Sequence, residues 1–461
     1  MKYFSLIALF ISTICLLTAC DGEGPKEYTS VVRKVGPTVE SQVMQHADWT
    51  HNAVGYRVDL YDQSTTADLN GLVEDLPRLK ELGIDYLVLP PIFESKLITD
   101  TILHDFKAFT DFRKIDEAFG TDVDFQNLSV ECHSRGIRIL LTWPSGQVSS
   151  ESVWAEDYPQ LFNDSLARKI ETRFWSGVVN TDFTNDTTLQ LISDTWSYWL
   201  ENFGVDGFYC TASELAPLTF WEKLRATIGA DEKQFFMATD RSDPAFHGEA
   251  FDMTATPRLH ETLLEVCSGN FPPEAIDLFI QQHERDFPLN AYRELYATND
   301  VIRTRKGSLE DQFGRAHKLV GILMFTLPGM PVMFTGQEVS AEIEGPPFES
   351  DSIDFNNALY SEFYSQLIKA HHENRALWSG LKGGRYERLT TAEDQALFAF
   401  SRSKGENKVV VILNFSDQPA DVDFEQSLDG TYQSIFNNEM LSIFTEGDVK
   451  LPPYGYQVFV K

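Results

Sequence analysis

The segment Gly204–Ala212 ends an apolar run with the hydroxyl group of Thr211. A threonine hydroxyl becomes a good nucleophile only when a neighbouring base takes its proton. Glu214 follows three residues later, but a glutamate in such a loop more often faces solvent than a cleft. Nothing in the segment itself therefore makes Thr211 a good nucleophile.

The elements around this segment alternate between helix and strand. Helical spacing of apolar residues predicts an amphipathic helix over Leu69–Leu82, which Gly83 ends, and a strand over Tyr86–Leu89. Eight such units build a (β/α)8 TIM barrel of the α/β class, with its working face at the carboxyl ends of the strands. From about residue 380 apolar residues alternate with a period of two, as in Ala396–Phe400, which predicts a C-terminal all-β sandwich domain.

These patterns divide the chain into four parts. We expect a signal peptide over 1–19 and a polar tether over 20–47. The barrel then takes 48–379, with a short insertion after its third strand at about 144–182, and the β-sandwich takes 380–461.

The first twenty residues resemble the signal of a bacterial lipoprotein. A short basic start precedes an apolar run too short to span a membrane, and small residues then stand before Cys20, the cysteine that would be acylated. We expect a lipid anchor at Cys20 and a location in the bacterial cell envelope, at the outer membrane. Asp21 and Glu23 resemble tags for export to the cell surface, and an ordinary secretory signal is the alternative.

Charge and cysteine content exclude several kinds of partner. The net charge is −31, from 38 basic and 69 acidic residues, so neither nucleic acid nor an anionic membrane surface would be attracted. Apart from Cys15 and Cys20, the chain has Cys132, Cys210 and Cys267, an odd number without metal-ligand spacing. We expect no disulfide framework, no metal and no cofactor.

Several segments outside the candidate site carry a family resemblance. The family is the alpha-amylase superfamily, glycoside hydrolase family 13. Its first barrel helix resembles Leu76–Gly83, and the turn that opens its second helix resembles Ala118–Thr121. Its strand-eight region resembles Thr326–Pro331 together with Phe334–Glu338. Gly204–Ala212 is similar to the fourth-strand motif of the same family. The resemblance covers roughly Asp48–Lys461 and implies the barrel and the C-terminal β domain.

The resemblance also implies three catalytic carboxylates, which this chain keeps incompletely. Tyr209 and Thr211 stand where the family has an arginine and the nucleophilic aspartate. Asp240 aligns with the family's glutamate acid and is one methylene shorter. If Arg241 pairs with Asp240 it would hold that carboxyl ionised, the wrong state for a general acid. Asp300 matches an aspartate that binds sugar hydroxyls, and a polar cap at a strand end is the alternative.

The third-strand motif departs from the family as well. The family has an aspartate, an asparagine that commonly helps to hold calcium, and a histidine; here the last two places hold Gly146 and Gln147. Because glycine has no side-chain ligand, we predict no calcium there. Phe106 and Trp143 fall at positions expected to line the cleft, where aromatic rings stack on sugars. The predicted substrate-binding residues are Phe106, Trp143 and Asp300.

Three functions remain open from the sequence. The first is an inactive family member that binds an α-glucan or a related oligosaccharide at the envelope. The second is a scaffold with a protein partner, as in the heavy-chain subunits of amino-acid transporters, which resemble this superfamily and lack its catalytic residues. The third is a glycoside hydrolase or transglycosidase with altered chemistry, using Asp240, Asp300 and Glu214.

Overall fold

The computed structural model describes most of the chain from Met44 onward. The described residues are 44–63, 66–98, 106–162, 177–229, 235–299, 307–339, 353–355, 359–424, 428–437, 439–444 and 449–461. The predicted signal peptide, Cys20 and all but the end of the tether lie outside these ranges. Within them, no helix combines the length and apolar character needed to cross a membrane.

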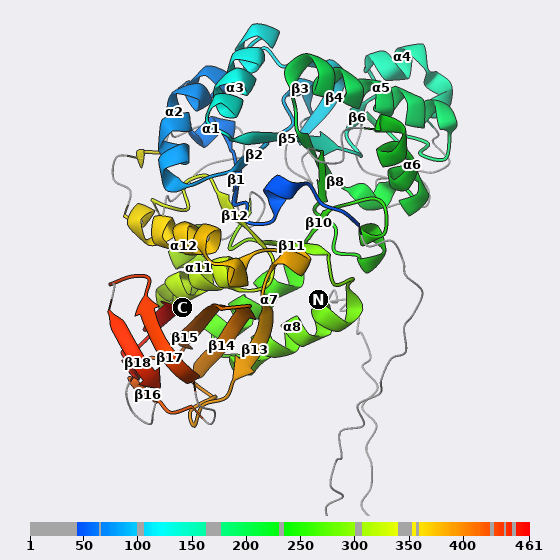
Figure 1. The fold of residues 1–461 in the computed structure, drawn as a ribbon. Coiled ribbons are helices and arrows are strands. Elements are labelled where there is room, and N and C mark those ends of the chain that lie inside the picture. The colour runs from blue at the N-terminus through cyan, green and yellow to red at the C-terminus, as the bar shows by residue number, and fades with distance from the viewer. Residues whose placement is uncertain are drawn as a thin grey trace, which may run out of the picture. The chain divides into compact units, whose positions relative to one another are not determined.

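Eight parallel strands close into a barrel, which confirms the predicted TIM barrel (Figure 1). In chain order the strands are β1 (Gly55–Arg57), β2 (Tyr86–Leu89), β5 (Arg138–Pro144), β8 (Gly207–Thr211), β9 (Phe236–Thr239), β10 (Met253–Ala255), β11 (Tyr292–Leu295) and β12 (Met330–Phe334). The larger helices between and after them are α2 (Leu69–Leu82), α3 (Asp122–Ser134), α5 (Asp186–Phe203), α6 (Leu218–Ile228), α7 (Pro257–Cys267), α8 (Glu274–Asp286), α11 (His317–Thr326) and α12 (Ser361–Glu373).

Local sequence signals explain where these helices begin and end. The Asp68 carboxylate accepts a hydrogen bond from the backbone N–H of Gly71 and caps α2. The helix ends at Gly83, whose φ of 104° is a backbone conformation that glycine adopts at low cost. Thr121 and Asp124 form a reciprocal capping box at the start of α3. These caps lie outside the helices' buried faces, so the helix ends are set by the local sequence.

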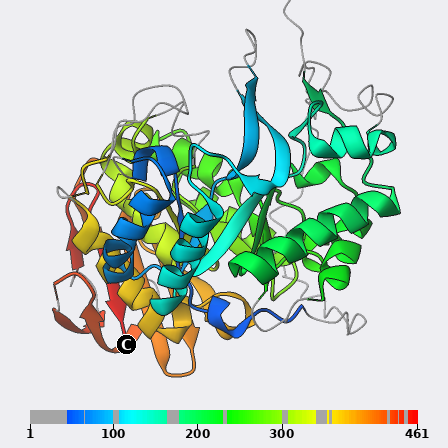
Figure 2. The same ribbon diagram turned by 90° about the horizontal axis from the view of Figure 1, so that it is seen from above.

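A small sheet beyond the barrel joins two connecting segments. The antiparallel strands β3 (Phe93–Ile98) and β4 (Phe106–Ile115) follow the second barrel strand, and Figure 2 shows them projecting from the rest of the ribbon. The strands β6 (Val148–Ser149) and β7 (Val178–Val179), which follow the third barrel strand, extend the same sheet. The sequence predicts an insertion only after the third strand, whereas β3 and β4 form a further insertion after the second strand.

The C-terminal region is antiparallel, as predicted. One sheet has the order β13-β14-β15-β20-β17-β18, and β16 pairs with β19 beside it. The strands are β13 (Arg385–Leu389), β14 (Leu397–Lys404), β15 (Asn407–Asn414), β16 (Ala420–Val422), β17 (Leu428–Ser434), β18 (Met440–Phe444), β19 (Val449–Leu451) and β20 (Tyr456–Val460). Phe398 and Phe400 of β14 pack into the large core that also holds the barrel helices, whereas Leu397 and Ala399 pack into a second core within the β domain. Both faces of β14 are therefore buried.

The two regions are joined by a buried arginine. Arg402 of β14 is 2% exposed. Its guanidinium donates hydrogen bonds to the backbone oxygens of Leu327, Leu377 and Trp378 at 2.8 to 3.0 Å. Burial lowers the pKa of Arg402 to about 9. Because its main partners are carbonyl groups, the side chain ties β14 to the chain segments that follow α11 and α12.

Candidate functional site

Thr211 and Asp240 lie side by side at the carboxyl ends of two neighbouring strands. Thr211 is the last residue of β8, and Asp240 directly follows β9, whose Thr239 is in register with Cys210. The Thr211 hydroxyl lies 3.4 Å from the carbonyl oxygen of Trp143. Among the described residues, no histidine or carboxylate accepts a hydrogen bond from this hydroxyl. The structure therefore gives Thr211 no base that would activate it.

The Asp240 carboxyl holds its proton to a higher pH than an ordinary aspartate does. One oxygen accepts a hydrogen bond from the backbone N–H of Ala212 at 3.2 Å, and the other lies 3.4 Å from the Thr239 hydroxyl. Asp240 is an exposed residue, and these two contacts hold its carboxyl group against the ends of β8 and β9. Desolvation there raises the pKa of Asp240 to about 6; the Ala212 bond opposes the rise, and the charge of Glu214 adds to it.

The pairing of Arg241 corrects one expectation from the sequence. The Arg241 guanidinium lies 4.0 Å from a carboxylate oxygen of Glu214, and both side chains are about half exposed. No ion pair joins Arg241 to Asp240 among the described residues. Arg241 therefore does not hold Asp240 ionised, and Asp240 can exist in the protonated form that a general acid requires.

The turn after Thr211 is held in an unusual conformation. Ala212 has a φ of 52°, in the left-handed region that residues other than glycine seldom adopt. The next residue, Ser213, shares a buried hydrogen bond of 2.7 Å with the Thr239 hydroxyl, and its carbonyl accepts from the indole of Trp221. These bonds keep the turn in place and keep the Ala212 N–H directed at Asp240.

A buried polar network lies within the barrel and was not found from the sequence. Glu294 of β11 is fully buried. Its carboxylate accepts hydrogen bonds from Arg57 at 2.7 and 3.0 Å and from the Tyr209 hydroxyl at 2.9 Å. Tyr209, which replaces the family's strand-four arginine, thus contacts a cation supplied by β1 instead. The signal available in the sequence was a glutamate inside the strand-like run Tyr292–Leu295.

Trp143 does not line a cleft, and this corrects a second expectation. Its side chain is 1% exposed. Rings surround it at centroid distances of 4.9 to 6.5 Å, from Phe93, Phe112, Trp154, Trp196 and Phe208. Side chains alternate along a strand, so Trp143 shares the outward face of β5 with Ile139 and Leu141, while Leu140 packs inside the barrel. Its ring is covered by protein and cannot stack on a sugar here.

The position that resembles the family's calcium-binding asparagine is filled from another loop. A Cβ atom added to Gly146 would lie 2.3 Å from a methyl carbon of Leu215. A larger residue at 146 would therefore need Leu215 to move. A small cavity of about 80 Å³ lies beside them, lined in part by Ser145 and Phe183. Across the described part of the chain, no group of three or more His, Cys, Asp or Glu side chains is arranged to hold a metal ion.

Two of the predicted sugar contacts are not tested by the structure. Phe106 is the first residue of β4, but its side chain is outside the described part of the chain. Asp300 lies wholly outside it. The structure therefore brings together Thr211, Asp240 and Glu214, moves Trp143 away from them, and leaves the roles of Phe106 and Asp300 as predictions.

Comparisons with known proteins point to one family. A family profile described as the alpha amylase catalytic domain matches residues 57–168, and a profile for the maltogenic amylase C-terminal domain matches residues 388–458. The alpha-amylase MalA of Haloarcula japonica is 25% identical over 431 residues, which cover 89% of this chain and 62% of that protein. The chain thus spans less than two thirds of that relative.

Solved structures agree with the sequence comparisons. An alpha-amylase from Lactobacillus plantarum superposes with a TM-score of 0.76 at 21% identity, covering 89% of this chain and 99% of that one. A noncanonic maltogenic alpha-amylase from Thermotoga neapolitana has a TM-score of 0.75 at 18% identity, covering 89% and 98%. The two family profiles match in the order expected for a barrel followed by a β domain, and in both regions the chain is similar to the alpha-amylase superfamily, glycoside hydrolase family 13.

Proposed function

We propose that this protein binds α-glucans without hydrolysing them. The substrate class follows from the relatives, which are named as alpha-amylases and maltogenic amylases. The single observation that carries the loss of hydrolysis is Thr211, a hydroxyl without an activating base at the position of the family's nucleophilic aspartate. A retaining glycosidase forms its covalent intermediate on a carboxylate, and threonine cannot replace that group.

The other features of the candidate site, at the carboxyl ends of β8 and β9, support weak binding of a glucan. Asp240 offers a carboxyl group that can donate or accept a hydrogen bond, because its pKa is raised to about 6. Asp300 and Phe106 are the further sugar contacts that we propose from the sequence. With few polar contacts, we expect a dissociation constant between about 10 μM and 1 mM.

The location that we propose is the bacterial cell envelope. The residues Leu17-Thr18-Ala19-Cys20 support a lipid on Cys20, and a polar tether follows them. A glucan-binding barrel held in this way would retain oligosaccharides close to the membrane, where an enzyme or a transporter can use them.

One observation favours a second candidate, an enzyme with altered chemistry. The pKa of Asp240 is raised to about 6, which suits a general acid. Arg241 pairs with Glu214 and therefore does not hold Asp240 ionised. Such an enzyme would still need a second carboxyl group to act as base or nucleophile. Glu214 is a candidate in the described part of the chain, since its charge acts on Asp240.

The deciding experiment measures binding and turnover on the same preparation. The chain without residues 1–20 is titrated calorimetrically with maltooligosaccharides, and release of reducing ends is followed in parallel. We expect binding without release, weakened by Asp240→Asn and by Asp300→Ala. Glu249→Gln, an exposed carboxylate away from β8 and β9, is the matched control and should bind normally.

The other outcomes separate the alternatives. Release of sugar that Asp240→Asn abolishes would establish the altered enzyme. If no glycan in a broad panel binds, the barrel serves as a scaffold. The burial of Trp143 and the packing of Leu215 against Gly146 would then indicate that the barrel has lost its sugar site.

A further inference from the structure

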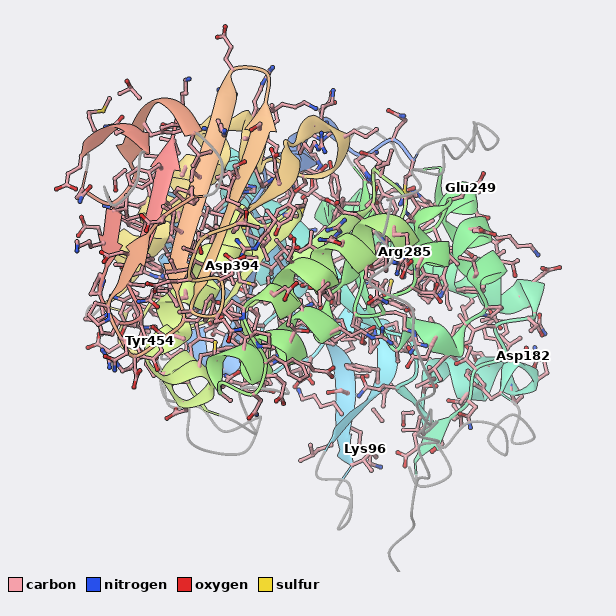
Figure 3. The ribbon with its side chains drawn as sticks, turned by 90° about the horizontal axis from the view of Figure 1, so that it is seen from below. Lys96, Asp182, Glu249, Arg285, Asp394 and Tyr454 are labelled. Atoms are coloured by element: carbon pink, nitrogen blue, oxygen red, sulfur yellow. The ribbon has the colours of Figure 1, made fainter. Side chains whose placement is uncertain are left out.

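A cavity of about 510 Å³ lies between α8 and the first strands of the C-terminal sheet. Figure 3 looks onto this side of the molecule, where α8, which carries the labelled Arg285, runs beside the sheet. The cavity is far from Thr211 in the fold, because its walls come from the start of β11, where Arg293 lies, and not from the carboxyl ends of the strands. Its volume is in the range of small-molecule sites and much larger than one ordered water needs.

Four cationic side chains line this cavity against a single carboxylate. They are Arg293, Arg385, Arg402 and Lys404, and the carboxylate is Glu284. The chain as a whole has a net charge of −31, so a concave site with an excess of positive charge stands out from its surroundings. Charge of this kind inside a cavity attracts anions and repels cations.

Arg293 is the inner cation of this cavity whose guanidinium is left without an acceptor among the described residues. Its guanidinium makes no hydrogen bond and no ion pair with any part of the chain that the structure describes. Burial lowers the pKa of Arg293 to about 10, and only the charge of Glu284 opposes this effect. Five N–H donors without acceptors are costly in a partly buried place unless a ligand or water supplies the acceptors.

The positive charge of Arg293 acts on several groups that lie near it. The charge of Arg293 contributes to the lowered pKa of Arg402, of His247 and of His283. Both ring nitrogens of His283 are buried without a hydrogen-bond partner in the described structure. Arg402 is already occupied by backbone carbonyls, so Arg293 is the inner cation that remains for a ligand.

The rim of the cavity adds both charge and apolar surface. Arg385 and Lys404 are exposed and approach from the β domain. Leu289 and Leu381 are also exposed on the rim, at 82% and 49%. A guanidinium fork matches the oxygens of a phosphate group, whereas exposed leucines suit a carbon framework attached to it.

We propose that this cavity is a binding site for a small organic phosphate, with the phosphate group on Arg293 and its organic part against the rim. This cavity is separate from the candidate glucan site at Thr211 and Asp240, so the proposal does not depend on the proposed function. Binding would join α8 and the loop after it to β13 and β14 through one ligand. It would thereby stabilise the junction between the barrel and the β domain.

The test uses the chain without residues 1–20 and two probes, inorganic phosphate and glucose 6-phosphate, with potassium chloride at matched ionic strength. Calorimetry and thermal unfolding should show that both phosphates bind and raise Tm, with the sugar phosphate binding more tightly, and that chloride and glucose do not. Arg293→Gln should weaken binding at least tenfold. Lys404→Gln should weaken it by about two- to fivefold, because its charge is at the exposed rim.

Glu284→Gln should change the affinity for phosphate in the opposite direction, and it serves as a control for misfolding. Removing this exposed carboxylate should tighten phosphate binding, an effect that a merely damaged protein would not show. Arg285→Gln, a neighbour whose side chain is 72% exposed and pairs with Asp286, is the matched control and should bind as the parent does. Unchanged binding in Arg293→Gln, or phosphate acting no better than chloride, overturns the site. Equal affinity for the two phosphates overturns the organic part of the proposal.

Discussion

The guanidinium of Arg57 lies 4.0 Å from the centre of the Tyr209 ring, and both side chains bond the same carboxylate, that of Glu294. Arg57 comes from the first barrel strand and Tyr209 from the fourth. In the alpha-amylase superfamily the position of Tyr209 belongs to an arginine next to the nucleophile. In this chain the positive charge comes from Arg57, and it pairs with the buried carboxylate of Glu294.

We expect Arg57→Met to destabilise the barrel by about 3–5 kcal/mol, because it leaves the Glu294 carboxylate buried without its cation. Tyr209→Phe should cost less, about 1.5–3 kcal/mol, since it removes one hydrogen bond to a charged group. Free energies of unfolding from urea titrations measure both. Arg285→Met on the exposed face of α8 is the control and should stay within about 0.5 kcal/mol of the parent. A loss below 1 kcal/mol for Arg57→Met would contradict the network.

Thr211→Asp alone should not restore hydrolysis of α-glucans. The substitution supplies a carboxylate at the nucleophile position, but Tyr209, Asp240, Gly146 and Gln147 still differ from the family. The release of reducing sugar from maltooligosaccharides should therefore stay at the level of the heat-treated protein. A turnover in Thr211→Asp that disappears when Asp240→Asn is added would show that one substitution separates this chain from an active enzyme.

Asp240 should titrate near pH 6. Its pKa is raised in the folded state above the ordinary value of 3.8, so the folded protein favours the protonated carboxyl. The contribution of Asp240 to stability should consequently fall as the pH rises from about 4 to about 6 and then stay level. Asp240→Asn should remove this loss, which solvent screening keeps to about 1 kcal/mol or less. Carboxyl carbon NMR of the parent and the variant identifies the titration, and a midpoint below pH 4.5 would refute it.

His371 should make the fold sensitive to acid. The side chain is fully buried on α12, and burial lowers its pKa to about 3, with the charge of His372 adding to the effect. A depressed pKa means that the unfolded chain binds the proton first, so the stability that neutral His371 contributes is complete above about pH 6.5 and is lost as the pH falls toward 3. His371→Gln should flatten the dependence of stability on pH in this window, measured by urea unfolding at pH 7, 5 and 4. An unchanged slope would disprove the assignment.

Cys20→Ser tests the lipid anchor. If Cys20 is acylated, the variant should leave the membrane fraction or remain unprocessed, and the N-terminal peptide of the parent should carry the mass of a lipid. Fractionation of the parent in a bacterial host, followed by mass spectrometry, measures both. Equal membrane association of the two proteins, with no lipid on the parent, would favour an ordinary secretory signal.

Local signals predicted much of the fold. The helix over Leu69–Leu82 and the strand over Tyr86–Leu89 have the same bounds in the structure as in the prediction. Each depends on caps, glycines and apolar spacing within its own segment, which the sequence displays directly. The strands β3 and β4 were missed, because they pair with each other and not with the barrel.

The candidate site was harder to predict because it depends on distant pairings. Arg57 and Glu294 are separated by 237 positions, and nothing local indicates that they meet. The direction of Trp143 depends on which face of β5 turns toward the helices, and a strand with apolar residues on both faces leaves that choice open. The partner of Arg241 likewise depends on the turn at Ala212, whose φ no short pattern predicted.

The packing of Trp143 also gives the protein an internal optical reporter. Its ring centroid lies 6.1 Å from that of Trp154 on the short helix α4 (Val153–Asp157) and 5.8 Å from that of Trp196 on α5. Indoles at such separations couple their electronic transitions, so near-ultraviolet circular dichroism should carry an exciton signal from this cluster. Undocking of α4 would erase that signal while the helical far-ultraviolet spectrum persisted. The same tryptophan that is unavailable to sugars can therefore show whether the segment above the barrel opens before the barrel itself unfolds.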